Sequence, residues 1–575
     1  MTDQVGRVIG TKSAQPLEFW LAVNDDKYVQ LDEVVAVTTT LPSARDDGRD
    51  KVDHYGVVDA VESAYEGASF HSDVFRDADG TLPVSVSTIA HVSVTRVSMR
   101  PIEPEAEVLV PPRPGQQVRR ADEQDRRMAL YFDKMVNRFP AGLSRDGLPV
   151  YGNLEFLDGS RGAHVNISGI SGVATKTTYA LFLLYGLFHS PSLRAAHATH
   201  SIVFNVKGED LLWLDKPNAK LPPDEYRRYE ALDLPVGPFS SVGLWAPAQK
   251  GDIVVPDTGS RQEGVNAYYW TLREFCKDRM LRFLFADADD ETSQLNFVVG
   301  QVERFLESQM DHQAPDRGEV GIDVGVGVPA NADSLSRLAD IVNDNIDEIA
   351  KRAADGTRQA FARRFEAAAS AVEQLIRAVP EREAARHRFD WAANQVSVVD
   401  INRLNDRAKR FVVGVVVRRL MEEKERSTTR DRYPLVYLVL DELNKYAPRE
   451  GRSPIKEVLL DIAERGRSLG VILIGAEQTA SEIERRVTAN ASFRVVGRLD
   501  AAESQRDEYG YLTASARVRA SILKPGSMFL QQPDVPVPLL VQFPFPSWAT
   551  RADEVAAGSA QPSGVFGRSD GRLDV

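Results

Sequence analysis

The chain has 575 residues, of which 43% are hydrophobic and 27% charged, so it is a globular protein of roughly two to four domains. Its formal net charge of -13 argues against a protein that coats nucleic acid, although a ring that is positive only along its pore stays compatible. With one cysteine, Cys276, no signal-peptide pattern and no apolar run of about 18 residues, we expect a cytoplasmic protein with neither a disulfide nor a membrane segment.

The first 110 residues contain short β-branched or aromatic runs separated by Asp, Gly and Ser, which predict a small β-barrel or sandwich. The runs are GRVIGT, FWLAV, VQLDEVVAV, HYGVVDAV and HVSVTRVSM. A Pro-rich, then charged stretch follows, and we expect a linker over residues 111–149.

From residue 150 onward, apolar strands alternate with longer helical segments, which predicts an α/β domain with a mainly parallel sheet. We expect this core in two parts, 150–264 and 391–550, separated by a helical insertion at 265–390. The predicted strands are 164–168, 202–206, 396–401, 435–440, 471–474 and 494–499, with helices over 178–188 and 455–465. The Gly-, Ser- and Asp-rich tail, 551–575, is expected to be mobile.

A glycine-rich turn lies between the strand at 165–168 and the helix that follows it. Such a turn points backbone N–H groups and the positive end of a helix at one place, which suits phosphate. The loop GISGVATKT is one residue longer than G-x-x-x-x-G-K-[ST], and Thr175 replaces the last glycine, so an ordinary strand–helix turn with an exposed lysine is the alternative. The predicted nucleotide-binding residues are Gly169, Ser171, Gly172, Val173, Ala174, Thr175, Lys176, Thr177 and Thr178.

A second candidate motif is the apolar run YPLVYLVLDE, which ends in Asp441 and Glu442. Parallel α/β sheets bind ligands where their strands end, so Asp441 with Thr177 predicts a Mg²⁺ site and Glu442 a base for the attacking water. A strand that runs out into a solvated acidic turn is the alternative. The two motifs together, each at a strand end, predict a P-loop ATPase whose cofactors are ATP and Mg²⁺.

These segments resemble the HerA branch of the HerA/FtsK superfamily, including a subgroup from bacterial defence systems. The resemblance covers HVNISGISGVATKT at 164–177, NVKGED at 205–210, LDELNKYAP at 440–448 and IAERGRSLGVILIGAEQ at 462–478. Residues 1–110 resemble the HAS-barrel that precedes HerA ATPase domains. Asn205 replaces the family's usual Asp. The fold implied is a RecA-like P-loop ATPase with a helical insertion, preceded by a small β-barrel.

The resemblance implies a homo-hexamer with ATP at the subunit interfaces. Gln478 would sense the γ-phosphate, and Arg465 or Arg467 would act as an arginine finger on the neighbour's ATP. A capping role for Gln478 and a solvated helix end for each arginine are the alternatives. Arg494 and Arg498 are weaker candidates, as well explained by a structural role.

The family implies a double-stranded DNA translocase or helicase that works with a partner nuclease or a sirtuin-like effector in anti-phage defence. An ATPase scaffold that assembles and regulates an effector without processive DNA transport is the second candidate, and an NTP-binding protein without hydrolysis the third. The basic segment 403–432 could track phosphates in a pore, but its apolar side also predicts an amphipathic helix packed on the core.

Overall fold

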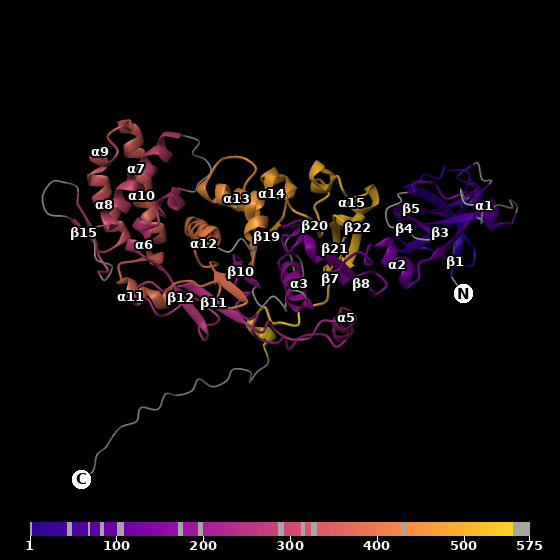
Figure 1. Cartoon of the computed structure of the whole chain (residues 1–575), viewed down its shortest axis with the longest axis horizontal. Coiled ribbons are helices and arrows are strands. Elements are labelled where there is room, and N and C mark those ends of the chain that lie inside the picture. The colour runs from indigo at the N-terminus through magenta and orange to yellow at the C-terminus, as the bar shows by residue number, and fades with distance from the viewer. Residues whose placement is uncertain are drawn as a thin grey trace, which may run out of the picture.

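The computed structural model describes residues 3–42, 49–66, 70–80, 85–100, 108–170, 176–191, 193, 199–285, 293–311, 317–323, 330–426 and 433–555. The molecule is elongated, with an N-terminal barrel at one end, an α/β core in the middle and a helical region at the other end (Figure 1). None of the helices in these ranges is long and apolar enough to cross a membrane.

The N-terminal region is a closed six-stranded barrel with the strand order β1-β2-β5-β4-β3-β6. Alternation of apolar and polar residues, as in EFWLAV of β2, turns Phe19 and Leu21 into its core. Short α1 (Asp73–Ala78) lies between β4 and β5. The strands are β1 (Gln4–Val8), β2 (Glu18–Val23), β3 (Val34–Pro42), β4 (Arg49–Glu66), β5 (Ser85–Arg100) and β6 (Gln117–Arg120).

The sixth barrel strand lies inside the segment that we expected to be a linker. β6 pairs with both β1 and β3 and so closes the barrel, and α2 (Glu123–Ala129) and β7 also fall within 111–149. The sequence QVRR carries a single buried residue, Val118, and its register comes from two partners far away in the chain. The barrel therefore runs on to residue 120, and the segment after it is structured.

The core is a twelve-stranded sheet in which every pair from β12 to β20 is parallel and the remaining pairs are antiparallel. The mainly parallel α/β fold expected from the sequence is confirmed. In sheet order the strands are β12 (Val265–Tyr268), β11 (Val242–Pro247), β17 (Val396–Asp400), β10 (Thr199–Asn205), β18 (Leu435–Asp441), β19 (Val471–Glu477), β9 (Val165–Ser168), β20 (Phe493–Val496), β21 (Ser527–Gln532), β22 (Val535–Gln542), β7 (Arg138–Leu143) and β8 (Pro149–Asn153).

Helices cover both faces of this sheet, which explains why β18 and β19 are buried along their whole length. α3 (Lys176–His189) packs into the apolar layer on one face, and α12 (Asp406–Arg426) and α13 (Pro454–Leu469) pack into the layer on the other. Ser453 caps α13 through the backbone N–H of Lys456, and left-handed Gly470 ends it one residue before β19. α5 (Glu225–Ala231), α14 (Arg485–Ala489) and α15 (Ala514–Ala520) complete the core.

The described residues of 265–390 are mostly helical, and Val265–Tyr268 belongs to the main sheet as its edge strand β12. A run of four residues, VNAY, is too short to distinguish a strand from a helix by periodicity. The insertion contains β13 (Trp270–Thr271), α6 (Leu272–Lys277), α7 (Ser293–Met310), β14 (Val320–Ile322), β15 (Ala330–Ala332), α8 (Leu335–Asp344), α9 (Ile346–Ile349), α10 (Asp355–Val372), β16 (Ile376–Arg377) and α11 (Glu381–Ala384). Cys276 is buried in this region.

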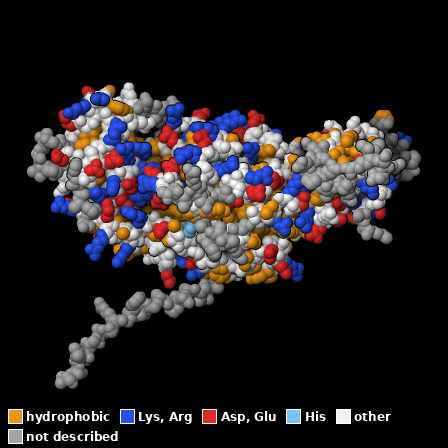
Figure 2. All heavy atoms as spheres, in the orientation of Figure 1, with side chains coloured by type: hydrophobic (Ala, Val, Ile, Leu, Met, Phe, Trp, Pro, Cys, Tyr) orange, Lys and Arg blue, Asp and Glu red, His pale blue; other side chains and the backbone are white. Residues whose placement is uncertain are grey.

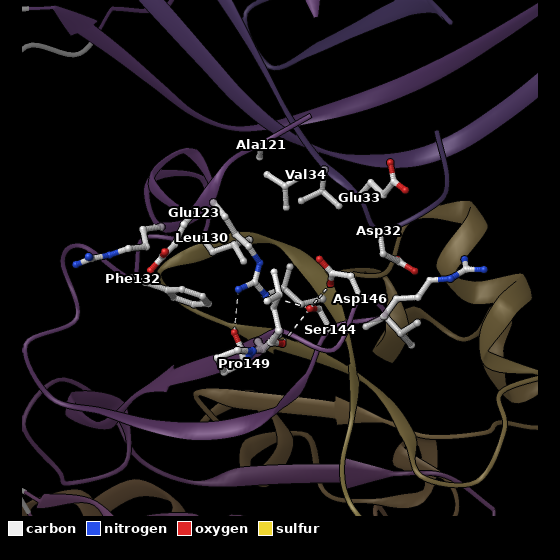
Figure 3. A pocket seen from close by; sticks show the side chains of 18 of the residues that line it. Asp32, Glu33, Val34, Ala121, Glu123, Leu130, Phe132, Ser144, Asp146 and Pro149 are labelled. Carbon is white, nitrogen blue, oxygen red and sulfur yellow. Dashed lines mark hydrogen bonds between the residues drawn. The ribbon is translucent and has the colours of Figure 1, made fainter. Parts of the chain in front are cut away.

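A cavity of about 620 Å³ lies where the barrel meets the core. Asp32, Glu33 and Val34 approach it from the barrel, and Leu130, Phe132 and Pro149 from the segment after β6 (Figure 3). Arg126 lines this seam cavity and donates to the Pro149 carbonyl oxygen (3.0 Å) and to Ser144 Oγ (3.2 Å).

Candidate nucleotide site

The predicted phosphate-binding and acidic segments meet at the carboxyl edge of the parallel sheet. β9 and β18 are separated by one strand, β19, with which both pair in parallel, so all three strands end at the same edge. The chain leaves β9 through α3 and returns in β10 on the far side of β18. Such a point, where strand connections diverge, opens a crevice for a ligand.

Lys176 is the first residue of α3, and its side chain points into this crevice region with only 2% of the residue exposed. Its Nζ is fully buried and has no hydrogen-bond partner among the described residues. Burial lowers the pKa of Lys176, the charge of Lys207 acts in the same direction, and Asp441 opposes both. A buried ammonium without a partner is costly, so this position suits an anion that the described part of the chain does not supply.

Thr177 and Asp441 lie in direct contact across the crevice. Thr177 Oγ1 donates to Asp441 Oδ2 at 3.0 Å, although the residues are 264 positions apart. Both side chains offer hard oxygen ligands, the kind that Mg²⁺ prefers, and they lie next to the phosphate-facing end of α3. This donor set fits a magnesium ion held by Thr177 and Asp441.

Glu442 follows Asp441 in a left-handed backbone conformation (φ 57°), which is rare for a residue other than glycine and recurs at functional sites. Lys207 Nζ lies 2.9 Å from Glu442 Oε1, and Lys445 Nζ lies 2.7 Å from Oε2. Burial acts to raise the pKa of Glu442, but the hydrogen bonds and charges of Lys445 and Lys207 outweigh it and lower the pKa. Glu442 is therefore a carboxylate whose two oxygens are both engaged by lysines.

Glu477, at the end of β19, is a titratable residue beside this site that the sequence analysis missed. It is completely buried, and Ser168 Oγ donates to its Oε1 at 2.7 Å. Burial raises the pKa of Glu477 to about 8, although the hydrogen bond from Ser168 and the charge of Lys176 act in the opposite direction. A carboxylate that ends a fully apolar strand, VILIGAE, next to Gln478 was the available signal.

A cavity of about 250 Å³ adjoins these residues. Its walls come from the start of α3, from the loop after β10 and from the C-terminal segment, which runs back beside that loop. Asn218 N donates to the Ser547 carbonyl oxygen at 2.9 Å, and Ala219 N to that of Glu554 at 2.7 Å. The lining residues include Lys176, Thr177, Thr178, Asn205, Lys207, Asp210, Asp441, Phe545, Thr550, Arg551 and Glu554.

The structure brings Lys176, Thr177, Thr178, Asp441 and Glu442 together, and Gly169 ends the strand side of the loop. Ser171, Gly172, Val173, Ala174 and Thr175 lie outside the described residues. Gln478 follows Glu477 and is exposed at the same edge of the sheet. Asn205 donates to Asp400 Oδ1 and to the Gly208 carbonyl oxygen, both at 2.8 Å, so it shapes the loop that carries Lys207.

Arg465 and Arg467 do not approach this chain's own site, because both lie near the end of α13 that precedes the start of β19. Arg465 pairs with Asp461 (3.0 Å) and Glu425. Arg467 is exposed and contacts only backbone in the described part of the chain, donating to the carbonyl oxygens of Gly159 (3.4 Å) and Ser160 (3.0 Å). Either arginine could act only on a neighbouring subunit, and Arg467 is the one without an acidic partner.

Arg494 and Arg498 have structural contacts. The guanidinium of Arg494 lies over the Tyr511 ring, 5.5 Å from its centroid. Arg498 lies beyond the end of β20, at Val496, and donates to the Ser521 carbonyl oxygen at 3.2 Å. These contacts favour the structural interpretation of both residues.

Several solved structures are similar to the chain. VirB4 of Thermoanaerobacter pseudethanolicus aligns with 14% identity over 71% of this chain and 96% of that chain, with a TM-score of 0.42. The bacterial conjugative coupling protein TrwBdeltaN70 aligns with 11% identity over 74% and 94% (TM-score 0.43), and the plasmid coupling protein TrwB in complex with ADP and Mg²⁺ with 12% over 69% and 88% (TM-score 0.42). No protein-family model and no curated protein matches the chain. The interpretation of the site therefore rests on its own geometry.

Proposed function

We propose that the protein binds ATP with Mg²⁺ and hydrolyses the terminal phosphate. The observation that carries this proposal is the contact between Thr177 and Asp441 (3.0 Å) beside the buried, unpartnered Nζ of Lys176. One crevice thus offers a cation for a phosphate and two oxygen ligands for a metal ion, and two segments far apart in the chain supply them.

The residues divide the chemistry among them. Lys176 neutralises phosphate charge, and Thr177 and Asp441 hold Mg²⁺, which when bound offsets the negative charge of the phosphates. Glu442 accepts a proton from water while the water oxygen bonds to the terminal phosphorus and the bond to the ADP oxygen breaks. Glu442 suits this role because it is a carboxylate that directly follows Asp441 at the end of β18.

We further propose a homo-hexameric ring in which Arg467 of one subunit reaches the ATP of the next, with Gln478 sensing the γ-phosphate. The position of Arg467, away from its own site and without an acidic partner, supports action in trans. Mixing Arg467→Ala and Lys176→Ala subunits tests this, because some interfaces of the mixed ring combine an intact loop with an intact arginine. Recovery of turnover above either variant alone is expected, and no recovery at any ratio would contradict a finger in trans.

The transport role proposed first is a double-stranded DNA translocase that serves a partner nuclease or other effector, as the resemblance to HerA implies. The second candidate is an ATPase scaffold for an effector. It is favoured because the basic helix α12, which could have bound DNA phosphates, packs on the core and has arginines that contact other residues of the chain. Its apolar residues Phe411, Val412 and Val415 are buried. Arg418 lies over the Phe283 ring, and Arg419 pairs with Glu274 (3.2 Å) and Asp278 (2.9 Å), so these arginines are engaged within the chain.

Figure 2 agrees with this view for the face that it shows, on which Lys and Arg are interspersed with Asp and Glu over the core and the insertion. The test is to measure the mass and the ATPase rate of one purified sample with and without double-stranded DNA. Six subunits with DNA-stimulated turnover would support the translocase. Six subunits with turnover indifferent to DNA would support the scaffold, and a folded protein that binds no nucleotide would overturn the proposal.

A further inference from the structure

Lys207 is a cation of the nucleotide site that no motif assigned a role. It lies in the loop after β10, it lines the same cavity as Lys176 and Thr177, and its side chain is 42% exposed. Its Nζ is 2.9 Å from Glu442 Oε1 and 3.9 Å from Asp441 Oδ2. One flexible side chain thus touches both the acidic pair and the space beside the phosphate-facing lysine.

Lys176 and Lys207 approach one cavity with like charges. Two ammonium groups that line one cavity repel each other. A group with several negative charges between them would relieve this repulsion and would give the buried Nζ of Lys176 its missing partner. A polyphosphate chain is such a group, and its terminal phosphate carries the largest charge.

Both oxygens of Glu442 contact an ammonium group. Lys207 lies at Oε1 and Lys445 at Oε2, so a water molecule competes with an ammonium group at each oxygen. In this arrangement the residue proposed to activate water is restrained.

We infer that Lys207 senses the terminal phosphate, leaving Glu442 for that phosphate when a nucleoside triphosphate binds and so freeing the carboxylate to activate water. This inference rests on the proposed function. A nucleoside diphosphate lacks the charge that draws Lys207 away, so Glu442 stays restrained after phosphate leaves. The long, flexible stem of lysine permits the change of partner without movement of the backbone.

Lys445 is the matched control. It is as exposed as Lys207 (47% against 42%) and holds the other oxygen of the same carboxylate, at 2.7 Å. Lys445 comes from the turn after β18, Leu443–Lys445, and it is not among the described residues that line the nucleotide cavity. A variant at Lys445 removes a contact to Glu442 without removing a cation from the cavity.

The experiment compares Lys207→Met and Lys445→Met with the unchanged full-length protein. Calorimetry with Mg²⁺ gives the dissociation constants of ADP and of the non-hydrolysable triphosphate AMP-PNP for each. Lys207→Met is expected to lose about tenfold to a hundredfold of the preference for AMP-PNP over ADP, the range of one charge-assisted hydrogen bond. Lys445→Met is expected to keep the preference within about threefold, and Lys207→Arg to restore most of it.

The ratio of the dissociation constants of ADP and AMP-PNP distinguishes a failure of the sensing role of Lys207 from a failure of the proposed nucleotide binding. If the unchanged protein binds neither nucleotide, the proposed function fails. If it binds both and Lys207→Met keeps the same ratio, the sensing role of Lys207 is overturned while the nucleotide site stands. An equal loss of preference in Lys445→Met would also overturn it, because the effect would then come from the restraint on Glu442. Melting curves check the folding of each variant, and Lys207→Gln replaces Lys207→Met if the latter does not fold.

Discussion

Two cavities of this molecule, the seam cavity and the cavity beside α3, differ in a way that their sizes do not suggest. The seam cavity between barrel and core measures about 620 Å³ and the cavity beside α3 about 250 Å³. In the larger one, Arg126 is held by the Pro149 carbonyl oxygen and Ser144 Oγ, whereas in the smaller one Lys176 Nζ is buried without a hydrogen-bond partner among the described residues. The buried ammonium of Lys176 therefore points to the smaller cavity as the proposed nucleotide site, although the seam cavity has the larger volume.

The same contrast holds for the acidic residues. Asp32 at the seam forms a bidentate pair with Arg519 of α15 (2.9 Å to Oδ1), which ties the barrel to the core. Glu477 near the smaller cavity has one oxygen bonded to Ser168, and its Oε2 has no partner in the described part of the chain. At the seam, both oxygens of Asp32 bind Arg519 and so connect the barrel to the core. At the carboxyl edge of the sheet, one oxygen of Glu477 has no partner among the described residues.

The largest expected effect comes from Glu442→Gln, which keeps the shape of the side chain and removes the base. Turnover should fall by about a hundredfold to ten-thousandfold, the usual contribution of general-base catalysis. ATP binding should persist, because Glu442 is not needed to hold the phosphates. Rates measured at saturating ATP, together with a binding isotherm, check this; normal turnover would remove Glu442 from the mechanism.

Lys176→Met should lower turnover by about a hundredfold to a thousandfold, since it removes one charged donor to the phosphates. The ligand-free protein should nevertheless melt at the same temperature as the unchanged chain or higher, because the variant replaces a buried, unpartnered charge with an apolar side chain of similar length. Calorimetric melting of the ligand-free protein decides this. A clear loss of stability would mean that Lys176 has a structural partner.

Arg126→Met at the seam should lower stability without affecting nucleotide binding, the opposite of what we expect for Lys176→Met. It removes two hydrogen bonds from a charged donor, so the free energy of unfolding should fall by about 1–3 kcal/mol. Nucleotide affinity should stay unchanged, since the seam and the crevice lie on different parts of the core. Denaturant unfolding and nucleotide titration of the same sample would test the expected loss of stability and the unchanged affinity. A drop in nucleotide affinity would contradict the separation of the seam cavity from the nucleotide site.

The smallest effect is expected from Glu477→Gln, and it depends on pH. Burial raises the pKa of Glu477 from its ordinary value of 4.5 to about 8, so the folded state holds a proton that the unfolded state releases. The unchanged protein therefore loses stability as pH rises from 4.5 to about 8, and Glu477→Gln escapes this loss. Its melting temperature should exceed that of the unchanged protein by a few degrees at pH 9, with little difference at pH 4 to 5; equal shifts at both ends would contradict the ionisation.

Much of the architecture could be predicted because it depends on local sequence patterns. The apolar runs that became β9, β18 and β19 are long enough to bury both faces of a parallel strand, and each is followed by a helix or turn signal. The barrel strands with clear alternation were found, but Gln117–Arg120 was not, since its strand character comes from pairing with β1 and β3. The boundary of the barrel was misplaced for that reason.

The sequence by itself determined the residue types of the site, namely a lysine and a threonine at a helix start and two carboxylates at a strand end. Only the tertiary structure decided that Thr177 and Asp441 touch across 264 residues, and that Lys207 and Glu477 belong to the same edge. It also decided that Lys176 Nζ is buried with no hydrogen-bond partner among the described residues. The physical reason is that local periodicity specifies which segment becomes a strand, whereas contact between side chains depends on strand order and register. Both are properties of the assembled sheet, in which β19 separates β9 from β18 and aligns their ends.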